Sequence, residues 1–461
     1  MTYKLLKHKK KFYITTAIDY VNASPHIGHA FEKVIADAIA RWHKLLGENV
    51  WFLTGTDENA QKNVEAAKQA GIDTQKFVDK NSKIFLELCG KLNISYNRFI
   101  RTTELPHIKK SQEIFRKVYE KGDIYKGKYE GNYCVGCESF KTEKDLVDGK
   151  CLIHNKQTEW LSEDTYFFRL SKYKNEIIKF VNNYIIPEIR KKEILSRLNE
   201  EELKDLSVSR ENLEWGIDNP IDNKFKIYVW IDALTNYISA LGYGNEDETN
   251  FEKFWPCDAH IIGKDILRFH AGVWIGMLMS AGIKLPKSVC VHGFITSEGQ
   301  KMSKSLGNVV DPLVYVDKYG ADALRYFLMR EIPTFDDGDF SHKRFVEVYN
   351  SELANGLGNL VNRVVMMTER YVGAKVPVAT KGEGVHEKIV GLLKRYEVAM
   401  ERFELKTACE TIYEVVDFGN KYIDDMKPWV MAKEENKELP IVLYNLLELL
   451  RFIAMMLIPY V

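Results

Sequence analysis

The chain has 461 residues, of which 45% are hydrophobic and 28% are charged, as is typical of a globular protein of roughly three domains. Its 65 Lys and Arg residues balance its 65 Asp and Glu residues, so net charge gives no reason to expect a nucleic-acid binder, and an RNA partner would need local basic patches. No stretch approaches the ~20 apolar residues of a membrane span, and the basic N-terminus lacks the apolar core of a signal peptide, so we expect a cytoplasmic protein without a membrane partner.

The first regular elements are predicted between residues 12 and 46. Residues 12–18 form an apolar run that indicates a buried strand, and residues 30–46 show the periodicity of a helix that stops at Gly47. We expect Ser24 to cap this helix and Pro25 to occupy its first turn, because proline has no N–H to leave unpaired there.

Two histidines lie at the start of this predicted helix. His26 and His29 are one helical turn apart, so both imidazoles fall on one face beside the positive helix N-terminus, an arrangement that favours phosphate. Gly28 between them leaves room for a flat ring to approach the backbone. Short motifs match by chance, and the alternative is a capped surface helix with two exposed histidines.

A second strand and a polar turn follow. Residues 49–54 predict a buried strand, and residues 55–59 are a polar turn at its carboxyl end. Strand, helix and strand indicate a right-handed βαβ unit in a Rossmann-like parallel sheet, and ligands of such sheets bind beyond the carboxyl ends of the strands. Both His26 and Asp57 fall there. Asp57 is either a helix cap or, beside the histidines, a partner for a substrate ammonium.

A candidate zinc site lies in residues 122–223, where the alternation of strands and helices is broken. Cys134 and Cys137 form one Cys-x-x-Cys knuckle, and Cys151 and His154 form a Cys-x-x-His knuckle. Three thiolates and one imidazole suit tetrahedral zinc, and because protein fills all four positions the metal should be structural. The alternative is a set of unrelated thiols or a redox pair.

Residues 224–325 return to the α/β pattern. We predict strands at residues 225–232, 259–265 and 288–294, so that the zinc-binding segment is a connective insertion between two halves of one sheet. After the third strand, Lys301 and Lys304 lie in a basic loop whose ammonium groups can follow a triphosphate through a reaction. Alone, this loop is better explained as a solvated surface segment.

The remaining chain is predicted to be helical. Residues 326–340 are expected to be a linker or stem-contact region, and residues 341–461 an antiparallel helical bundle. The domains predicted in chain order are residues 1–121 and 224–325 for the two catalytic halves, residues 122–223 for the insertion, the linker, and the bundle.

The motifs together resemble those of class I aminoacyl-tRNA synthetases, and in particular the methionyl-tRNA synthetase family. The histidine motif spans residues 25–29 and the lysine motif residues 301–305. The other matching segments are residues 17–20, 228–233, 263–266 and 427–429, together with the single zinc site within an insertion.

This resemblance implies a ligase that activates methionine with ATP and transfers the methionyl group to the 3′ end of tRNA(Met). It implies that ATP, accompanied by Mg²⁺, is handled by His26, Gly28, His29, Gly263, Asp265, Lys301 and Lys304. It implies a methionine site formed by Ala17, Ile18, Tyr20, Asp57, Trp230, Tyr237 and His270. It implies that the anticodon is read by Asn359, Arg363 and Trp429.

Several positions depart from the family pattern, and rival functions remain open. Ala17, Asp19, Asn59 and Leu234 stand where the family commonly has other residues, which affects the shape of the pocket more than the reaction. Without the family, the aromatic residues of the predicted methionine and anticodon sites could equally be core. The rival functions are another nucleotidyltransferase with the same histidine motif, a class I synthetase for a different amino acid, and a non-enzymatic RNA-binding protein.

Overall fold

The computed structural model describes residues 10–136, 139–141, 143–153, 155–200, 202–211, 213–303, 306–378 and 383–461. They form two compact units, and each is described by itself. The first comprises Met1–Pro25, Gly47–Gly90 and Ser95–His292, and the second comprises His26–Leu46, Lys91–Ile94 and Gly293–Val461.

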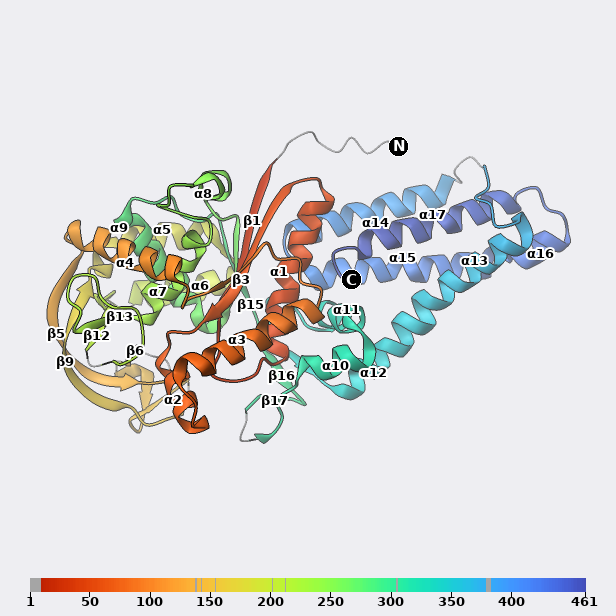
Figure 1. Ribbon diagram of the computed structural model, residues 1–461. Coiled ribbons are helices and arrows are strands. Elements are labelled where there is room, and N and C mark those ends of the chain that lie inside the picture. The colour runs from red at the N-terminus through yellow and green to blue at the C-terminus, as the bar shows by residue number, and fades with distance from the viewer. Residues whose placement is uncertain are drawn as a thin grey trace. The chain divides into compact units, whose positions relative to one another are not determined.

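A parallel sheet forms the centre of the first unit (Figure 1). Among the described residues it has seven strands in the order β10-β15-β14-β1-β3-β2, with β4 also paired to β3. Its pairings are all parallel, as the sequence predicts. Its strands are β1 (Lys11–Thr16), β2 (Asp19–Tyr20), β3 (Asn49–Asp57), β4 (Arg98–Arg101), β10 (Ile185–Ile186), β14 (Ala259–Gly263) and β15 (Val289–His292).

The central strands are buried because helices cover both faces of a parallel sheet. Ile14 of β1, Phe52 of β3 and Ile261 of β14 are fully buried, which explains why these strands read as continuous apolar runs. The helices of this unit are α2 (Gln61–Ala70), α3 (Thr74–Lys91), α4 (Leu105–Glu120), α5 (Lys174–Tyr184), α6 (Glu188–Glu200), α7 (Val229–Ser239), α8 (Thr249–Phe254) and α9 (Ile275–Ala281), with a π-helix at Phe269–Trp274.

The strand predicted at residues 225–232 is wrong beyond its first three residues. Only β13 (Phe225–Ile227) is a strand, and α7 begins at Val229. Every residue of α7 from Val229 to Ile238 is buried. The first residues of α7, Val229–Ile231, are apolar and continue the apolar run of β13, so the predicted strand extends past the point where the helix begins.

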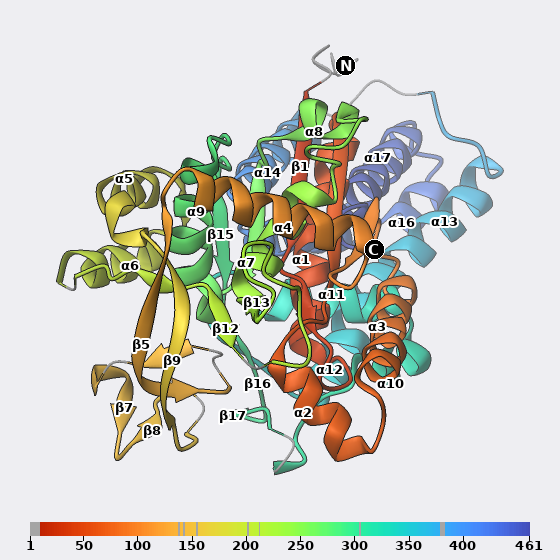
Figure 2. The same ribbon diagram turned by 60° about the vertical axis from the view of Figure 1, so that its left-hand side comes forward.

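The segment predicted as an insertion is dominated by a long antiparallel ribbon, β5 (Ile124–Cys134) with β9 (Glu159–Phe168), which Figure 2 shows in yellow. These two strands belong to a four-stranded sheet with β6 (Ser139–Lys141) and β11 (Leu206–Ser207). Smaller pairs follow, β7 (Leu146–Val147) with β8 (Lys150–Cys151), and β12 (Ser209–Glu211) with β13. The same segment also supplies β10 to the edge of the parallel sheet, so residues 122–223 are not wholly separate from it.

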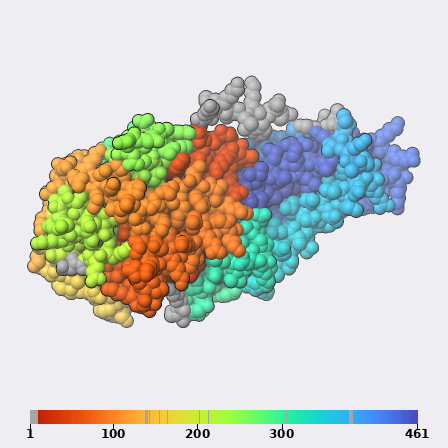
Figure 3. Space-filling view, in the orientation of Figure 1, coloured from red at the N-terminus to blue at the C-terminus, as the bar shows by residue number. Residues whose placement is uncertain are grey.

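The second unit contains the helix α1 (Ile27–Leu45) and the C-terminal bundle, whose surface is light to dark blue in Figure 3. Leu443, Leu446 and Leu449 are fully buried, as expected for the core of the predicted bundle. Its further elements are β16 (Ile295–Ser297), β17 (Gln300–Lys301), α10 (Pro312–Tyr319), α11 (Ala321–Glu331), β18 (Gly338–Phe340), α12 (His342–Val348), a π-helix at Tyr349–Gly358, α13 (Asn359–Val372), α14 (Glu383–Glu401), α15 (Leu405–Met426), α16 (Pro428–Lys433) and α17 (Leu439–Leu457).

Two expectations for this unit need correction. Residues 326–340 are not a plain linker, because residues 326–331 complete α11 and β18 pairs with β16. The expectation that no stretch approaches a membrane span is also wrong, because α17 is long and apolar enough by length and composition. In α17, 44% of the apolar window is buried. Leu443, Leu446 and Leu449 of this helix lie in the bundle core, and core helices of globular proteins can be equally long and apolar.

A buried arginine joins three parts of the second unit. The guanidinium of Arg325, fully buried on α11, lies 2.7 Å from the Asp37 carboxylate of α1. It also donates to the carbonyl of Leu92 at 3.0 Å and to those of Pro459 and Tyr460 at 3.2 Å. A buried charge is tolerated when it is paired and its donors are satisfied, and this arginine meets both conditions.

Candidate active site

The histidine pair forms its own cap at the start of α1. The N-cap residue is His26, not Ser24, and Pro25 lies before the helix. The backbone N–H of Gly28 donates to Nδ1 of His26 at 3.1 Å, and the backbone N–H of His26 donates to Nδ1 of His29 at 3.0 Å. The prediction of a serine cap is therefore wrong because the imidazoles supply the acceptors that a small polar side chain usually provides.

This capping arrangement determines which ring nitrogen can donate. Nδ1 accepts in both rings, so a neutral imidazole carries its proton on Nε2. The rings are stacked with their centroids 3.8 Å apart. The first backbone N–H groups of α1 already have partners, including the Ile27 N–H, which donates to the Val310 carbonyl at 3.0 Å. An anion at this helix start would therefore meet imidazole donors rather than backbone donors.

The His26 ring lies close to Gly28. A Cβ at position 28 would lie 2.9 Å from Cε1 and 3.0 Å from Nδ1 of that imidazole. The flat ring that approaches this glycine in the structure is therefore the His26 side chain itself. A larger residue at position 28 would require that ring to move.

The basic loop returns to the start of α1. Lys301 is exposed at the end of β17, which pairs with β16, and Lys304 and Ser305 lie outside the described residues. The side chain of Asn308 closes the loop, accepting from the Ser303 N–H at 2.9 Å and donating to the Lys301 carbonyl at 3.2 Å. Two residues later, Val310 accepts the Ile27 N–H. The histidine motif and the lysine motif thus belong to one unit and are joined by a hydrogen bond.

The residues predicted to bind methionine belong to the first unit. Ala17 follows β1 and donates its N–H to the Ile261 carbonyl at 3.1 Å, and Tyr20 of β2 pairs with Asp57 at the end of β3. Asp57 is only 2% exposed. The alternative that it caps a helix is wrong, because the N-cap of α2 is Ala60.

Aromatic rings dominate the rest of the predicted methionine set. Trp230 stacks on Phe269 with ring centroids 3.7 Å apart and the planes 7° from parallel. The hydroxyl of Tyr237 lies 2.7 Å from Nε2 of His270, whose Nδ1 lies 3.1 Å from the Ile266 carbonyl. A carbonyl only accepts, so the ring proton is on Nδ1 and the tyrosine donates to Nε2.

His270 is uncharged near neutral pH. Its complete burial lowers its pKa to about 4, because desolvation penalises the imidazolium form. Burial also lowers the pKa of the neighbouring His260 well below its usual value. The indole Nε1 of Trp230 is buried, and among the described residues it has no hydrogen-bond partner. This cluster is therefore neutral and offers one unsatisfied donor.

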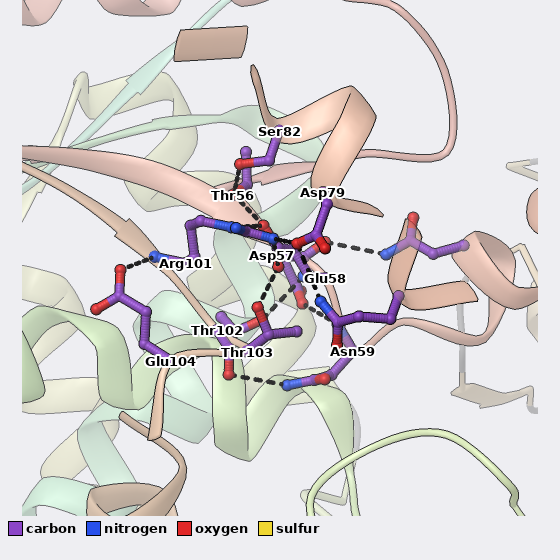
Figure 4. A network of polar contacts seen from close by, with 12 residues as sticks. Thr56, Asp57, Glu58, Asn59, Asp79, Ser82, Arg101, Thr102, Thr103 and Glu104 are labelled. Atoms are coloured by element: carbon purple, nitrogen blue, oxygen red, sulfur yellow. Dashed lines mark hydrogen bonds and ion pairs between the residues drawn. The ribbon is translucent and has the colours of Figure 1, made fainter. Parts of the chain in front are cut away.

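The polar turn after β3 holds an ion-pair network that the local sequence patterns did not predict (Figure 4). The fully buried carboxylate of Glu58 accepts from Nε of Arg101 at 2.7 Å and from its Nη2 at 2.9 Å. The backbone N–H of Glu58 donates to the hydroxyl of Thr102 at 2.8 Å. Asn59 continues the network by donating to Asp232 of α7 at 2.8 Å. The sequence signal that could have indicated it was the Arg-Thr-Thr at the carboxyl end of β4, which is the neighbour of β3.

The other predicted sites are represented in part. Gly263 ends β14 and Asp265 lies in the short turn after it. Cys134 and Cys151 are each 1% exposed, whereas Cys137 and His154 lie outside the described residues. Within the described part of the chain, no three His, Cys, Asp or Glu residues are grouped as metal ligands.

The predicted anticodon residues lie on two helices of the second unit. Asn359 begins α13 and is exposed, and Arg363 one turn later forms an ion pair with Asp424 at 2.6 Å. Trp429 lies on α16 and is 39% exposed. The alternative that this tryptophan is a core residue of the bundle is therefore wrong.

Comparisons with known proteins match nearly the whole chain. The family described as "tRNA synthetases class I (M)" matches residues 12–151 and 141–365, and the "Anticodon binding domain of methionyl tRNA ligase" matches residues 373–461. A methionine–tRNA ligase from Clostridium perfringens is 47% identical over 98% of this chain and 72% of its own length. One from Thermotoga maritima is 45% identical over 97% of this chain and 73% of its own. The solved Mycobacterium tuberculosis methionyl-tRNA synthetase in complex with methionyl-adenylate has a TM-score of 0.94 and 39% identity, covering 98% of this chain and 91% of its own.

Proposed function

The chain belongs to the methionine–tRNA ligase family of class I aminoacyl-tRNA synthetases, and from this premise we propose how its residues divide the reaction. The enzyme activates methionine with ATP, releases pyrophosphate, and transfers the methionyl group to the 3′ end of tRNA(Met). Matches to a methionine-specific synthetase and to its anticodon domain replace the rival predictions of another nucleotidyltransferase or a different amino-acid specificity. A cytoplasmic location stays a prediction.

We assign the phosphate chemistry to the histidine pair and the basic loop. The methionine carboxylate attacks the α-phosphorus of ATP, the bond to the bridging oxygen breaks, and pyrophosphate leaves with its electrons. Negative charge builds on the phosphate oxygens, so donors that bind more tightly in this transition state accelerate the step. The hydrogen bond from Ile27 to Val310 is the observation that carries this assignment, because it brings the exit of the basic loop to the histidine cap.

Within this assignment His26 and His29 donate from Nε2, and Lys301 and Lys304 follow the leaving pyrophosphate. The capping hydrogen bonds support the histidine role, because they hold both Nδ1 atoms as acceptors and so leave Nε2 as the donor. Magnesium is expected to accompany ATP as part of the substrate. We assign the adenosine to Gly263 and Asp265, at the carboxyl end of β14, where ligands of such sheets bind.

We propose that the neutral aromatic cluster binds the methionine side chain. Methionine carries no charge or donor there, so recognition must use shape and sulfur, and sulfur–ring contacts contribute ~0.3–1.5 kcal/mol each. The neutral His270, its Tyr237 partner and the unsatisfied Trp230 donor support this role. Ala17, Ile18 and Tyr20 complete the site, and Asp57 receives the ammonium. A missing methylene changes binding by only about 1–3 kcal/mol, so homocysteine should also enter.

We propose that the ribbon segment binds one structural zinc ion through Cys134, Cys137, Cys151 and His154. The burial of Cys134 and Cys151 supports this proposal, and so does their position, since each is the last residue of its strand, where ligands of zinc knuckles commonly lie. Bound zinc would hold the short strands together. The ligand set is closed, so we assign the metal no part in the reaction.

We propose that Asn359, Arg363 and Trp429 read the anticodon. The exposure of Trp429 supports this role, since a base stacked on an aromatic ring contributes ~1–3 kcal/mol. The test of the whole assignment is ATP–pyrophosphate exchange measured with each of the twenty amino acids, followed by aminoacylation of tRNA. Methionine should give the fastest exchange. Exchange with isoleucine, valine or cysteine but not with methionine would contradict the assignment.

A further inference from the structure

A buried chain of hydrogen bonds connects three elements of the first unit. The amide of Asn59, in the turn after β3, donates to Oδ2 of Asp232 on α7 at 2.8 Å. Oδ1 of the same carboxylate lies 2.6 Å from Nε2 of His107 on α4. Nδ1 of His107 lies 2.8 Å from the hydroxyl of Ser239, at the end of α7. Asp232 and His107 are each only 1% exposed.

The chemistry of these groups fixes the direction of the hydrogen bonds to Asp232. An ionised carboxylate only accepts, so Asn59 donates to Oδ2 of Asp232, while His107 and, at 3.5 Å, the Ser111 hydroxyl donate to Oδ1. His107 therefore uses its Nε2 proton for Asp232, and its Nδ1 is left for the Ser239 hydroxyl. A buried carboxylate is costly unless its oxygens are satisfied, so each oxygen requires its donor to stay in place.

Asp232 lies between the predicted methionine residues, so these hydrogen bonds affect how those residues are placed. Asp232 follows Trp230 by two residues and precedes Tyr237 by five on α7. Its partner Asn59 follows Asp57 by two residues and is further held by a 3.2 Å hydrogen bond to the Thr102 carbonyl (Figure 4). The Asn59–Asp232 bond thus fixes the turn that carries the ammonium acceptor against the helix that carries the aromatic residues.

We propose that Asp232 is a positioning residue for methionine, with Asn59 and His107 as its two supports. This inference rests on the proposed roles of Asp57, Trp230 and Tyr237. It gives a structural task to Asn59, one of the positions at which the chain departs from the family pattern. Loss of the Asp232 carboxylate would let the turn and α7 shift independently, which weakens methionine recognition and leaves the phosphate chemistry of the second unit intact.

A cavity gives small molecules access to this chain of hydrogen bonds. It has a volume of about 200 Å³ and is lined by His107 and Ser239 together with Arg98, Glu104 and Asn245. An imidazole molecule is much smaller than this space. If the histidine side chain were removed, free imidazole could therefore enter from the cavity and restore the donor to Asp232.

The first experiment measures ATP–pyrophosphate exchange with Asp232→Asn and Asn59→Ala, varying methionine and ATP separately. An amide at position 232 has one acceptor oxygen where the carboxylate has two, and a hydrogen bond to a charged group is among the stronger ones. The KM for methionine should rise roughly 10- to 100-fold, while the KM for ATP stays within about twofold. Asn59 is only partly buried, so its alanine variant tests the proposal if Asp232→Asn fails to fold.

Asp123→Asn is the matched control. Asp123 is also a buried carboxylate of the first unit, but it accepts from Lys172, Tyr173 and Ser280, none of which is assigned to methionine. It should lower thermal stability without raising the KM for methionine. If the Asp232 and Asn59 variants keep a normal KM for methionine, or raise both KM values equally, the positioning role is overturned. If the unaltered chain shows no methionine-dependent exchange, the proposed function fails instead.

The second experiment tests whether a hydrogen bond or only bulk is needed at His107. His107→Gly should raise the KM for methionine, and added imidazole should lower it toward that of the unaltered chain. Toluene, which fills space without donating a hydrogen bond, should not lower the KM. If His107→Gly folds but imidazole does not change its KM for methionine, the role of His107 as a support is overturned.

Discussion

The replacement Gly28→Ala should separate activity from stability, because two effects on stability oppose each other at this position. The new Cβ would lie 2.9 Å from Cε1 of His26, so the ring must move and the Gly28 N–H loses its acceptor. Loss of an N-cap costs about 1 kcal/mol, whereas alanine in place of glycine stabilises a helix by about 1 kcal/mol. The free energy of unfolding should therefore change by less than about 1 kcal/mol.

The effect on adenylate formation should be much larger. When the His26 ring moves, its Nε2 donor is displaced. Loss of one preorganised donor to a developing oxyanion lowers kcat by ~10²–10³, or about 3–4 kcal/mol. Methionine-dependent ATP–pyrophosphate exchange measures this loss, and thermal unfolding measures the stability. Gly47→Ala, at the other end of the same helical segment, is the control. Gly47 has a φ of +81° and open space around its Cα, so alanine there should lower stability and leave exchange unchanged. Full exchange activity in Gly28→Ala would refute the reasoning.

Four further predictions concern the other sites. Lys304→Ala should slow adenylate formation by orders of magnitude in single-turnover assays, and an unchanged rate would remove this lysine from the mechanism. For His270, burial lowers the pKa to about 4, so the unfolded chain binds more protons between pH 6.5 and 4; stability should fall by about 3 kcal/mol as the pH drops through this window, and His270→Gln should flatten the dependence in urea titrations. Elemental analysis should find one zinc per chain, and Cys134→Ser should reduce that content; a metal-free but fully folded chain would contradict the zinc proposal. Trp429→Ala should raise the KM for tRNA by roughly 5- to 150-fold, corresponding to the loss of one stacked base, with a much smaller change in exchange; equal aminoacylation at low tRNA concentration would show that this ring does not stack a base.

Local sequence patterns predicted the parts of the site that depend on local geometry. The spacing of His26 and His29 placed both rings on one helical turn, and the apolar runs of β1, β3, β14 and β15 predicted a parallel sheet. The cap was mispredicted because the usual preferences favour small polar residues, and an imidazole pair that caps itself falls outside them. The strand predicted over α7 failed because the apolar residues at the start of this buried helix continue the apolar run of β13.

Contacts between distant residues could not be predicted from the chain alone. Asn59 lies 173 residues from Asp232, and His107 lies 125 residues from it, so no periodic pattern connects them. A polar residue in such a segment reads as a turn or a cap until the fold supplies its partner. The same holds for Glu58 and Arg101, whose pairing follows from the neighbouring positions of β3 and β4 in the sheet.

The buried guanidinium of Arg325 limits how this chain can evolve. Its donors fan out to a carboxylate on α1 and to carbonyls from two other segments, a geometry that the single ammonium of lysine cannot reproduce. Substitutions at Asp37, or changes in the backbone path near Leu92 or Pro459, would each leave part of this buried guanidinium without its acceptor. Substitutions in these separate segments should therefore occur together or be rejected. The helix that begins with the histidine pair is subject to the same constraint.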